Sequence, residues 1–411
     1  MIKTFDAHGF PAKVGPRLFL ALATLSQTGM SFVQQGIVVM GVFFASAYHL
    51  TLAQMGLVTS ALSLGVMTSM IFMGRLADRL GPRTLLFWGA AAMGGFTGVL
   101  ALVRGFWPLL VVLYAVGAAL ATTPAAGTKA VFTAFARRPR GLVMGIRQTR
   151  VPLGALLAAS FLPRLAEGAG LHMIFWLFAG ELLVTSWLFG ASMEPLYPIG
   201  VSRAPADPRF DWRLVGQVWR PALVGILLVS GQYLLLGFSL SDLHRVHHVG
   251  IVTAGLIVAA SQLGGGFSRV ASGALSDRLG GRRTPVIMWC AILAAGMSLV
   301  VAWLPTSVPF AALLLVWFFF GMGAVGWNAL TLTWAAESVP SEHSGLAMMS
   351  VGTAIFLGSA LFPPLFGALI DATHRFSFGF SLLALNLGLA ALLAWRFGRG
   401  EAHLLRTRSA S

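Results

Sequence analysis

Charged residues are scarce in this chain of 411 residues. Only 10% are Asp, Glu, Lys or Arg, whereas 57% are hydrophobic, and the mean hydropathy is +0.82. A soluble domain normally carries about 25% charged residues, so this chain has too few to cover a surface in contact with water. The scarcity excludes an ordinary soluble protein and indicates many membrane-spanning segments.

Cysteine is nearly absent, and so are the motifs of catalysis. The single Cys290 excludes an intrachain disulfide framework and a multi-cysteine metal site. No nucleotide-binding or nucleophile motif occurs, which argues against an enzyme or an ATP-driven pump. We therefore expect neither a cofactor nor a metal. The N-terminal stretch MIKTFDAHGFPAKVGPR lacks a signal-peptide cleavage pattern, so we expect no processing.

What the chain does have is long apolar runs of about 20 residues, the length that crosses a bilayer. Backbone groups in lipid need internal partners, so each run should be a helix and the fold class an all-α integral membrane protein. Twelve spans are predicted, at 17–43, 53–73, 84–104, 107–134, 142–163, 170–191, 219–240, 250–271, 285–304, 308–335, 345–369 and 376–396.

Basic residues set the predicted orientation. The net charge is +15, which would suit a nucleic-acid partner, but the charges form short clusters between the apolar runs. Most of these clusters fall on the side of the N-terminus, and only Arg104, Arg164, Arg245 and Arg375 fall on the other. The bias predicts a multi-pass protein of the plasma (inner) membrane with both termini cytoplasmic, and a lipid bilayer rather than nucleic acid as its surroundings.

One loop occurs twice. GRLADRLGPRT follows the second span and GALSDRLGGRRT the eighth, with Asp78 and Asp277 199 residues apart. A long polar stretch with four prolines separates the two copies, so we expect two halves, 1–191 and 219–411, joined by a cytoplasmic linker at 192–218. Internal repeats of this kind are common in transporters.

Each loop aspartate lies where a span meets the cytoplasm, and such a carboxylate can accept hydrogen bonds from a neighbouring helix N-terminus. Contacts of this type can form in one conformation and break in another, whereas the alternative is a solvated turn. The predicted gating residues are Gly74, Asp78, Arg79, Gly81, Arg140, Gly273, Asp277, Arg278 and Gly280.

Both loops resemble the signature loop of the major facilitator superfamily, G-x-L-a-D-r-x-G-r-[r/k]. The resemblance covers essentially the whole chain. It implies two six-helix bundles related by a pseudo-twofold axis, and a transporter that alternates between inward-open and outward-open states. It also implies that helices 1, 4, 7 and 10 line a central cavity. On these presumed lining spans, polar side chains at helical spacing give the candidate substrate-binding residues Gln27, Gln34, Gln232, Tyr233 and Asn328; ordinary interhelical hydrogen bonds are the alternative.

Four cations fall inside predicted spans: Lys129, Arg147, Arg150 and Arg269. A cation at a helix centre costs about 2.5–3.5 kcal/mol if it faces lipid, so each must meet water, a partner or a ligand. Snorkelling to the interface is plausible for Lys129, Arg147 and Arg269, but Arg150 lies deeper. All four are candidate anion-binding residues.

Two of these arginines carry a further resemblance. The stretch FSRVASGALSDR, with Arg269 four residues before the loop glycine, resembles the monocarboxylate transporters, in which this arginine meets a substrate carboxylate. Their usual aspartate one turn earlier is replaced by Gly265, which puts proton coupling by that pair in doubt. RQTRVPLGA resembles the antiporter motif of the family's fifth helix but matches it only in part. Arg150 stands near a position where that motif has a glycine, whereas Pro152 is retained and indicates a bend.

Acidic residues within the spans are almost missing. Glu181 alone lies deep inside a span and is either a structural partner or a proton-coupling residue. The sequence therefore predicts a secondary active transporter for a small organic anion, most simply a carboxylate, exchanged with protons or a counter-anion and acting as a monomer. Two alternatives stay open: a proton-driven efflux antiporter for amphipathic compounds, and a transporter-like membrane sensor.

Overall fold

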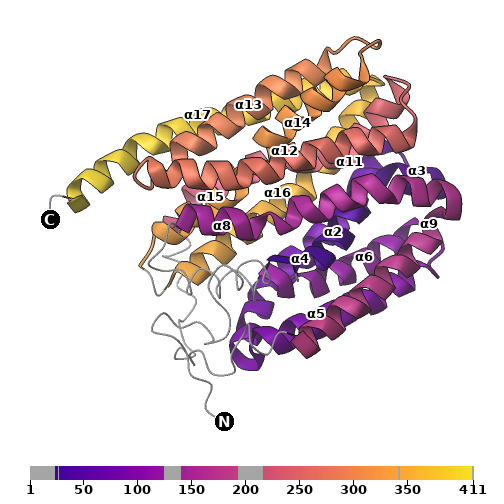
Figure 1. Cartoon of the computed structure of the whole chain (residues 1–411), viewed down its shortest axis with the longest axis horizontal. Coiled ribbons are helices and arrows are strands. Elements are labelled where there is room, and N and C mark those ends of the chain that lie inside the picture. The colour runs from indigo at the N-terminus through magenta and orange to yellow at the C-terminus, as the bar shows by residue number, and fades with distance from the viewer. Residues whose placement is uncertain (1–23, 26, 125–139, 193–215, 341–342, 410–411) are drawn as a thin grey trace.

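The computed structural model describes residues 24–25, 27–124, 140–192, 216–340 and 343–409 (Figure 1). Within these ranges the secondary structure is helical and no strand occurs. The helices of the N-terminal part are α2 (Thr28–Val39), α3 (Gly41–Tyr48), α4 (Leu52–Leu80), α5 (Pro82–Leu100), α6 (Phe106–Leu120), α8 (Arg140–Gln148) and α9 (Arg150–Ser192). Those of the C-terminal part are α11 (Trp219–Arg245), α12 (Ile251–Arg278), α13 (Thr284–Ala302), α14 (Phe310–Gly326), α15 (Asn328–Glu337), α16 (Ser344–Thr373) and α17 (Phe376–Ser409).

Each of the twelve predicted spans contains helix in the described residues, whereas 17–23 and 26 of the first span and 125–134 of the fourth lie outside them. In the described part of the chain, nine helices are long and apolar enough to cross a membrane, and the bent pair α2–α3 makes a tenth. Two predicted spans are fused in α9, which changes direction at Gly170, where φ is +78°. The remaining one is the shorter apolar helix at Thr84–Leu100. The predicted all-helical membrane fold is confirmed.

The two parts of the chain form two bundles that lie side by side (Figure 1). The indigo-to-magenta helices make one bundle and the orange-to-yellow helices the other. One end of the pair carries the two repeated loops, and we call it the motif face; the other end is the opposite face. The linker residues 192–218 fall mostly outside the described ranges, so the exact boundaries of the halves stay a prediction.

Close glycine contacts occur at equivalent places in the two halves. Gly65 of α4 packs on the Tyr114 carbonyl of α6, and Gly264 of α12, 199 residues later, packs on the Phe318 carbonyl of α14. In return, Gly117 and Gly321 approach the facing backbone of α4 and α12 so closely that a Cβ would overlap it. Small residues allow such close helix contacts in membranes, so an equivalent pair of glycines brings two helices together in each half.

This packing predicts a stability difference between two glycines of the same half. A methyl group on Gly321 would collide with the Ser261 carbonyl, whereas one on Gly296 of α13 would meet nothing within 4 Å. Overpacking of this kind costs about 1–3 kcal/mol. We expect Gly321→Ala to lower the melting temperature of the detergent-solubilised protein by several degrees, and Gly296→Ala to leave it unchanged or slightly raised. Equal melting temperatures for the two variants would contradict the assigned packing.

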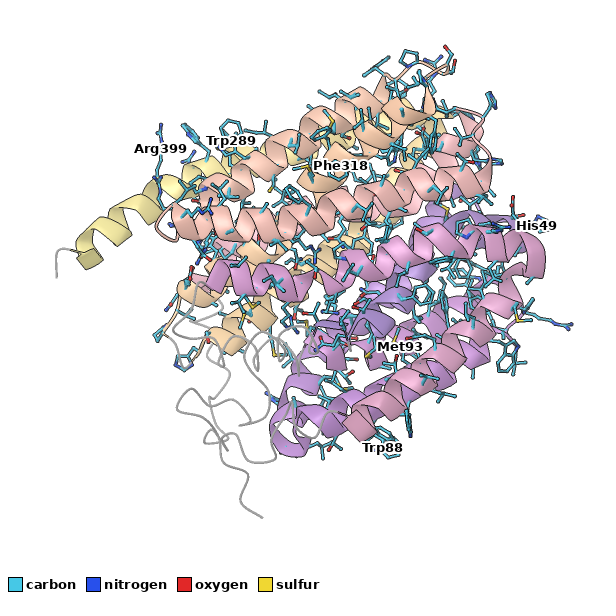
Figure 2. All side chains as sticks on the ribbon, viewed as in Figure 1. His49, Trp88, Met93, Trp289, Phe318 and Arg399 are labelled. Atoms are coloured by element: carbon cyan, nitrogen blue, oxygen red, sulfur yellow. The ribbon has the colours of Figure 1, made fainter. Side chains whose placement is uncertain are left out.

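The outer surfaces of both bundles are apolar. Trp88 on α5 and Trp289 on α13 are 63% and 62% exposed, and Figure 2 shows them on opposite outer sides of the molecule, whereas Met93 points into its own bundle. Large exposed hydrophobic side chains are costly in water but suit the lipid that surrounds a membrane protein. The scarcity of charge in the sequence therefore corresponds to a surface that faces hydrocarbon.

The halves meet along two seams, α4 against α16 and α8–α9 against α12. Each seam is closed at both ends by small residues. Gly74 lies against Met349 and Gly367 against Leu52 in the α4–α16 seam, while Gly273 lies against Gly141, and Gly255 against Ala159, in the other. In the described residues the two halves thus touch near both faces of the membrane.

Among the described residues, three spans are broken where they pass between the halves, and the sequence indicated only one of these breaks. The first span bends by 51° at Met40 between α2 and α3. The fifth is interrupted at Thr149, and the tenth at Trp327. Thr149 precedes Pro152, which has no N–H to donate to the carbonyl four residues earlier. That carbonyl belongs to Gln148, so the proline leaves it available for another donor.

Candidate functional site

Arg269 is the central residue of the interface between the halves. It lies on α12, is 1% exposed, and donates to three oxygens on three other helices. Its Nε donates to the Val325 carbonyl at 3.0 Å, its Nη1 to the Gln148 carbonyl at 2.6 Å, and its Nη2 to Gln232 Oε1 at 3.3 Å. All three acceptors are neutral, so these contacts leave the positive charge of the guanidinium uncompensated.

Two of these acceptors come from broken helices. The Gln148 carbonyl is the one that Pro152 cannot use, and Val325 lies two residues before the break at Trp327. The Gln148 side chain continues the connection, since its Nε2 donates to Asn328 Oδ1 on α15 at 3.3 Å. Arg269 and Gln148 therefore join the fifth, seventh, eighth and tenth spans at the break points.

Arg147 and Arg150 point from the fifth span to one face of α2. Arg147 is fully buried and its Nη2 lies 3.4 Å from Gln27 Oε1, while Arg150 Nη1 donates to Ser31 Oγ at 2.9 Å. Gln27 and Ser31 are one helical turn apart. Arg147 is thus directed into the protein rather than to the membrane surface. Because Gln148 lies between the two arginines, all three guanidinium groups gather around the same break.

A second polar cluster lies around Tyr233, the residue of α11 that follows Gln232. The Gln34 side chain on α2 donates to the Tyr233 hydroxyl at 3.4 Å, and the hydroxyls of Ser63 on α4 and Ser359 on α16 lie beside it. Four helices, two from each half, meet at this hydroxyl. Gln34 and Tyr233, which the sequence proposed as candidates, are therefore brought together, one residue along α11 from the Gln232 that contacts Arg269.

The two remaining candidates are placed differently. Lys129 lies outside the described residues. Glu181 lies against Gly29 of α2 and accepts a hydrogen bond from Thr185 Oγ1 at 2.7 Å. This contact is one turn along its own helix, on the side of α2 near the sixth span. A role of Glu181 in coupling stays a prediction.

Asp277 caps a helix of the other half at the motif face. Its Oδ1 accepts from the Gly141 N–H at 3.2 Å and its Oδ2 from the Leu142 N–H at 2.9 Å, both in the first turn of α8. A carboxylate at a helix N-terminus is stabilised by the free N–H groups and by the helix dipole. The contact has the geometry that the loop sequence suggested for its aspartates.

Arg283 holds the capping aspartate in place. It is 3% exposed, and its guanidinium donates to Ser276 Oγ at 2.6 Å, to Asp277, and through Nε and Nη2 to Glu337 at 3.1 and 3.0 Å. Burial alone would lower the pKa of Arg283, but the hydrogen bonds and charges of Glu337 and Asp277 outweigh it and raise this pKa. In the sequence Arg283 is one of several basic residues of the second loop, and nothing there distinguishes it from a charge that only sets the orientation.

The other loop residues contribute backbone shape and close packing. Gly81 and Gly280 have φ of +79° and +71°, a region that favours glycine, so both loops turn at the same point of the repeat. Arg79 and Arg278 are exposed. The side chains of Asp78 and Arg140 lie outside what the structure describes, so their gating roles stay predictions.

A second cap lies at the opposite face, and sequence reasoning missed it. Asp371, near the end of α16, accepts from the Leu52 N–H at 3.1 Å and from the Ala53 N–H at 2.8 Å, in the first turn of α4. In the sequence it is an acid near the end of a predicted span, a position that gives no sign of its partner. The C-terminal half thus supplies one capping carboxylate at each face of the interface.

The seams differ at the level of Arg269. Met70 stands 199 residues before Arg269, at the equivalent point of α4, and its side chain packs on Gly352 of α16. The polar junction of the α9–α12 seam therefore corresponds to an apolar methionine–glycine contact in the α4–α16 seam. In the part of the chain that the structure describes, the cationic centre belongs to the α9–α12 seam.

Broken helices at a buried cationic centre, lying between two helical bundles with a cap at either face, define a membrane transporter. The family model of the Major Facilitator Superfamily matches residues 20–363 and 222–409, and the chain belongs to this superfamily. An uncharacterized MFS-type transporter of Mycobacterium tuberculosis is 30% identical over 88% of this chain and 81% of its own length. The 3-(3-hydroxy-phenyl)propionate transporter of Escherichia coli is 27% identical over 85% of each chain.

Solved structures agree on the fold. A bacterial homologue of the human lysosomal transporter Spinster, inward-facing and unoccupied, has a TM-score of 0.69 at 14% identity over 96% of this chain and 98% of its own. The nucleoside transporter NupG has a TM-score of 0.71 at 15% identity over 93% and 99%. At such identities the likeness concerns the twelve-helix fold alone. As a member of the superfamily, the chain is a multi-pass membrane transporter for small molecules and not an enzyme.

Proposed function

We propose that this transporter carries a small organic anion, specifically a carboxylate, by alternating access between its halves 1–191 and 219–411. The observation that carries the proposal is Arg269, a buried guanidinium at the interface whose described hydrogen-bond partners are all neutral. A buried charge is costly without an opposite charge. A carboxylate that enters between the halves supplies one, and forms strong charge-assisted hydrogen bonds with the arginine fork.

Arg150 and Arg147 add to the same field from the fifth span. Because Arg269 reaches the carbonyl between them, an anion near this break is attracted by groups from both halves. A substrate held from both sides favours the closed state, which is the differential binding that alternating access requires. A cationic centre also repels cationic drugs, which speaks against the efflux of such compounds.

The relative from Escherichia coli points the same way, because its name gives an aromatic carboxylic acid as its substrate. We further propose that the protein works as a monomer in the plasma membrane with the motif face and both termini cytoplasmic, as the basic residues favour. The coupling partner is a proton or a counter-anion.

Counterflow into proteoliposomes tests this proposal. Vesicles loaded with unlabelled mono- or dicarboxylates should accumulate the labelled acid, because exchange through one cationic site is symmetric, whereas vesicles loaded with cationic amphipathic compounds should not. Protein-free liposomes give the background. Flux of cationic compounds alone would replace the proposal by efflux antiport, and carboxylate binding without flux would replace it by a sensor.

A further inference from the structure

The side chains around the Tyr233 hydroxyl, which we call the Tyr233 cluster, carry no charge, whereas an anion site needs positive charge. Its members, Gln34, Ser63, Tyr233 and Ser359, are all buried and uncharged. They come from α2, α4, α11 and α16, near the middle of each helix. Transporter substrates bind near the bilayer midplane, at the interface of the repeats, and this cluster lies at that level with two helices from each half.

One member of the cluster is poorly satisfied. Ser63 is 1% exposed, and its Oγ has the Tyr233 hydroxyl beside it but forms no hydrogen bond of regular geometry within the described residues. Buried hydroxyls are normally hydrogen-bonded, and an unsatisfied one costs about 1–3 kcal/mol. By contrast, Ser359 donates to the Phe356 carbonyl, as a purely structural serine does. The poorly satisfied Ser63 Oγ points to a polar group that is brought there by a ligand.

The cluster lies next to the cationic centre. Arg150 contacts Ser31, and Gln34 follows one turn later on α2, where neighbouring Cβ atoms are about 5–6 Å apart. On α11, Gln232 contacts Arg269 and Tyr233 belongs to the cluster. A small molecule with a carboxylate at one end and a hydroxyl at the other matches this succession of cations and neutral hydrogen-bonding groups.

We propose that Tyr233, Ser63 and Gln34 form a hydroxyl-recognition subsite, and that the preferred substrates are hydroxylated carboxylic acids, with the carboxylate at the arginines and the hydroxyl at Tyr233. This inference rests on the proposed function and adds a specificity to it. A site built to bind a hydroxyl discriminates against analogues that lack it.

The test compares two probes that differ by one hydroxyl, 3-phenylpropionate and 3-(3-hydroxyphenyl)propionate, in the counterflow assay. We expect wild-type protein to prefer the hydroxylated acid. Ser63→Ala and Tyr233→Phe should each lower kcat/KM for the hydroxylated acid by roughly five- to tenfold, as the loss of one buried hydrogen bond implies, and should leave 3-phenylpropionate nearly unchanged. A merely structural role would lower the flux of both probes together.

Ser298→Ala is the matched control, because this buried serine donates to the Phe380 carbonyl, away from the interface; it should change neither probe selectively. Transport of both acids by wild-type protein without preference, or parallel losses in the variants, would overturn the subsite while leaving carboxylate transport intact. Transport of neither these acids nor any other carboxylate would overturn the proposed function itself.

Discussion

Replacing Arg269 with glutamine should abolish carboxylate transport. The variant removes the buried cation, and a glutamine amide cannot reach the three acceptors, Val325, Gln148 and Gln232, that the guanidinium now serves. Loss of one partner from a buried charge pair costs several kcal/mol, so we expect kcat/KM to fall by about 100-fold or more. Initial rates of counterflow in proteoliposomes measure the effect.

Three further variants separate the contributions of charge and geometry. Arg269→Lys keeps the charge but loses the planar fork, so it should retain weak transport with a raised KM. Arg150→Gln, which removes a cation whose contact with Ser31 is a single hydrogen bond, should also abolish flux. Arg164→Gln is the control, since this arginine lies on the same helix α9 but is exposed. Near-normal flux in both glutamine variants at positions 150 and 269, in correctly inserted protein, would refute the anion site.

Removing either capping carboxylate should open the transporter on one side only. Asp371→Ala leaves the Leu52 and Ala53 N–H groups without their acceptor at the opposite face, and Asp277→Ala does the same to Gly141 and Leu142 at the motif face. Loss of a helix cap costs about 0.5–2 kcal/mol, which shifts an equilibrium between closed and open states by roughly tenfold. The shift should favour opening at the face that lost its cap.

Spin-label distances can follow this shift in detergent or nanodiscs. A pair at Leu80 and Leu279 reports on the motif face, and a pair at Arg104 and Arg245 on the opposite face; all four residues are exposed, and each pair spans the halves. The native Cys290 is buried, so it will not compete for the label. We expect Asp371→Ala to lengthen the second distance only, and Asp277→Ala the first only. Lengthening of the same distance by both variants would contradict the assignment of one cap to each face.

Most of the fold could be predicted from sequence patterns, because crossing a bilayer imposes simple constraints on a chain. Apolar length and the need for internal hydrogen bonds predicted twelve helices, and the repeated loops predicted two equivalent halves. The breaks at Met40 and Trp327 were not foreseen, since no proline accompanies them. They depend on contacts with the other helices, which a local pattern does not contain.

The candidate site was predicted in part. Arg147, Arg150 and Arg269 stood out because a cation within an apolar run is costly, and they do gather around one helix break. Gln148 was missed because its backbone carbonyl, not its side chain, is the key group, although Pro152 four residues later was the available signal. Asp371 and Arg283 were missed because a charge near a span end is ordinary in sequence, and only the neighbouring helix shows what it binds.

The contrast between Met70–Gly352 and Arg269–Gln148 has a consequence for energy coupling. At this level of the α4–α16 seam, parting Met70 from Gly352 breaks a purely apolar contact, so this contact opens at little cost whether or not cargo is present. Parting the arginine from its carbonyl exposes a charge and an acceptor, which an anion can satisfy. We infer that the Arg269 junction responds to the occupancy of the site whereas the Met70–Gly352 contact does not, so two equivalent positions of the repeat differ in their response to the cargo.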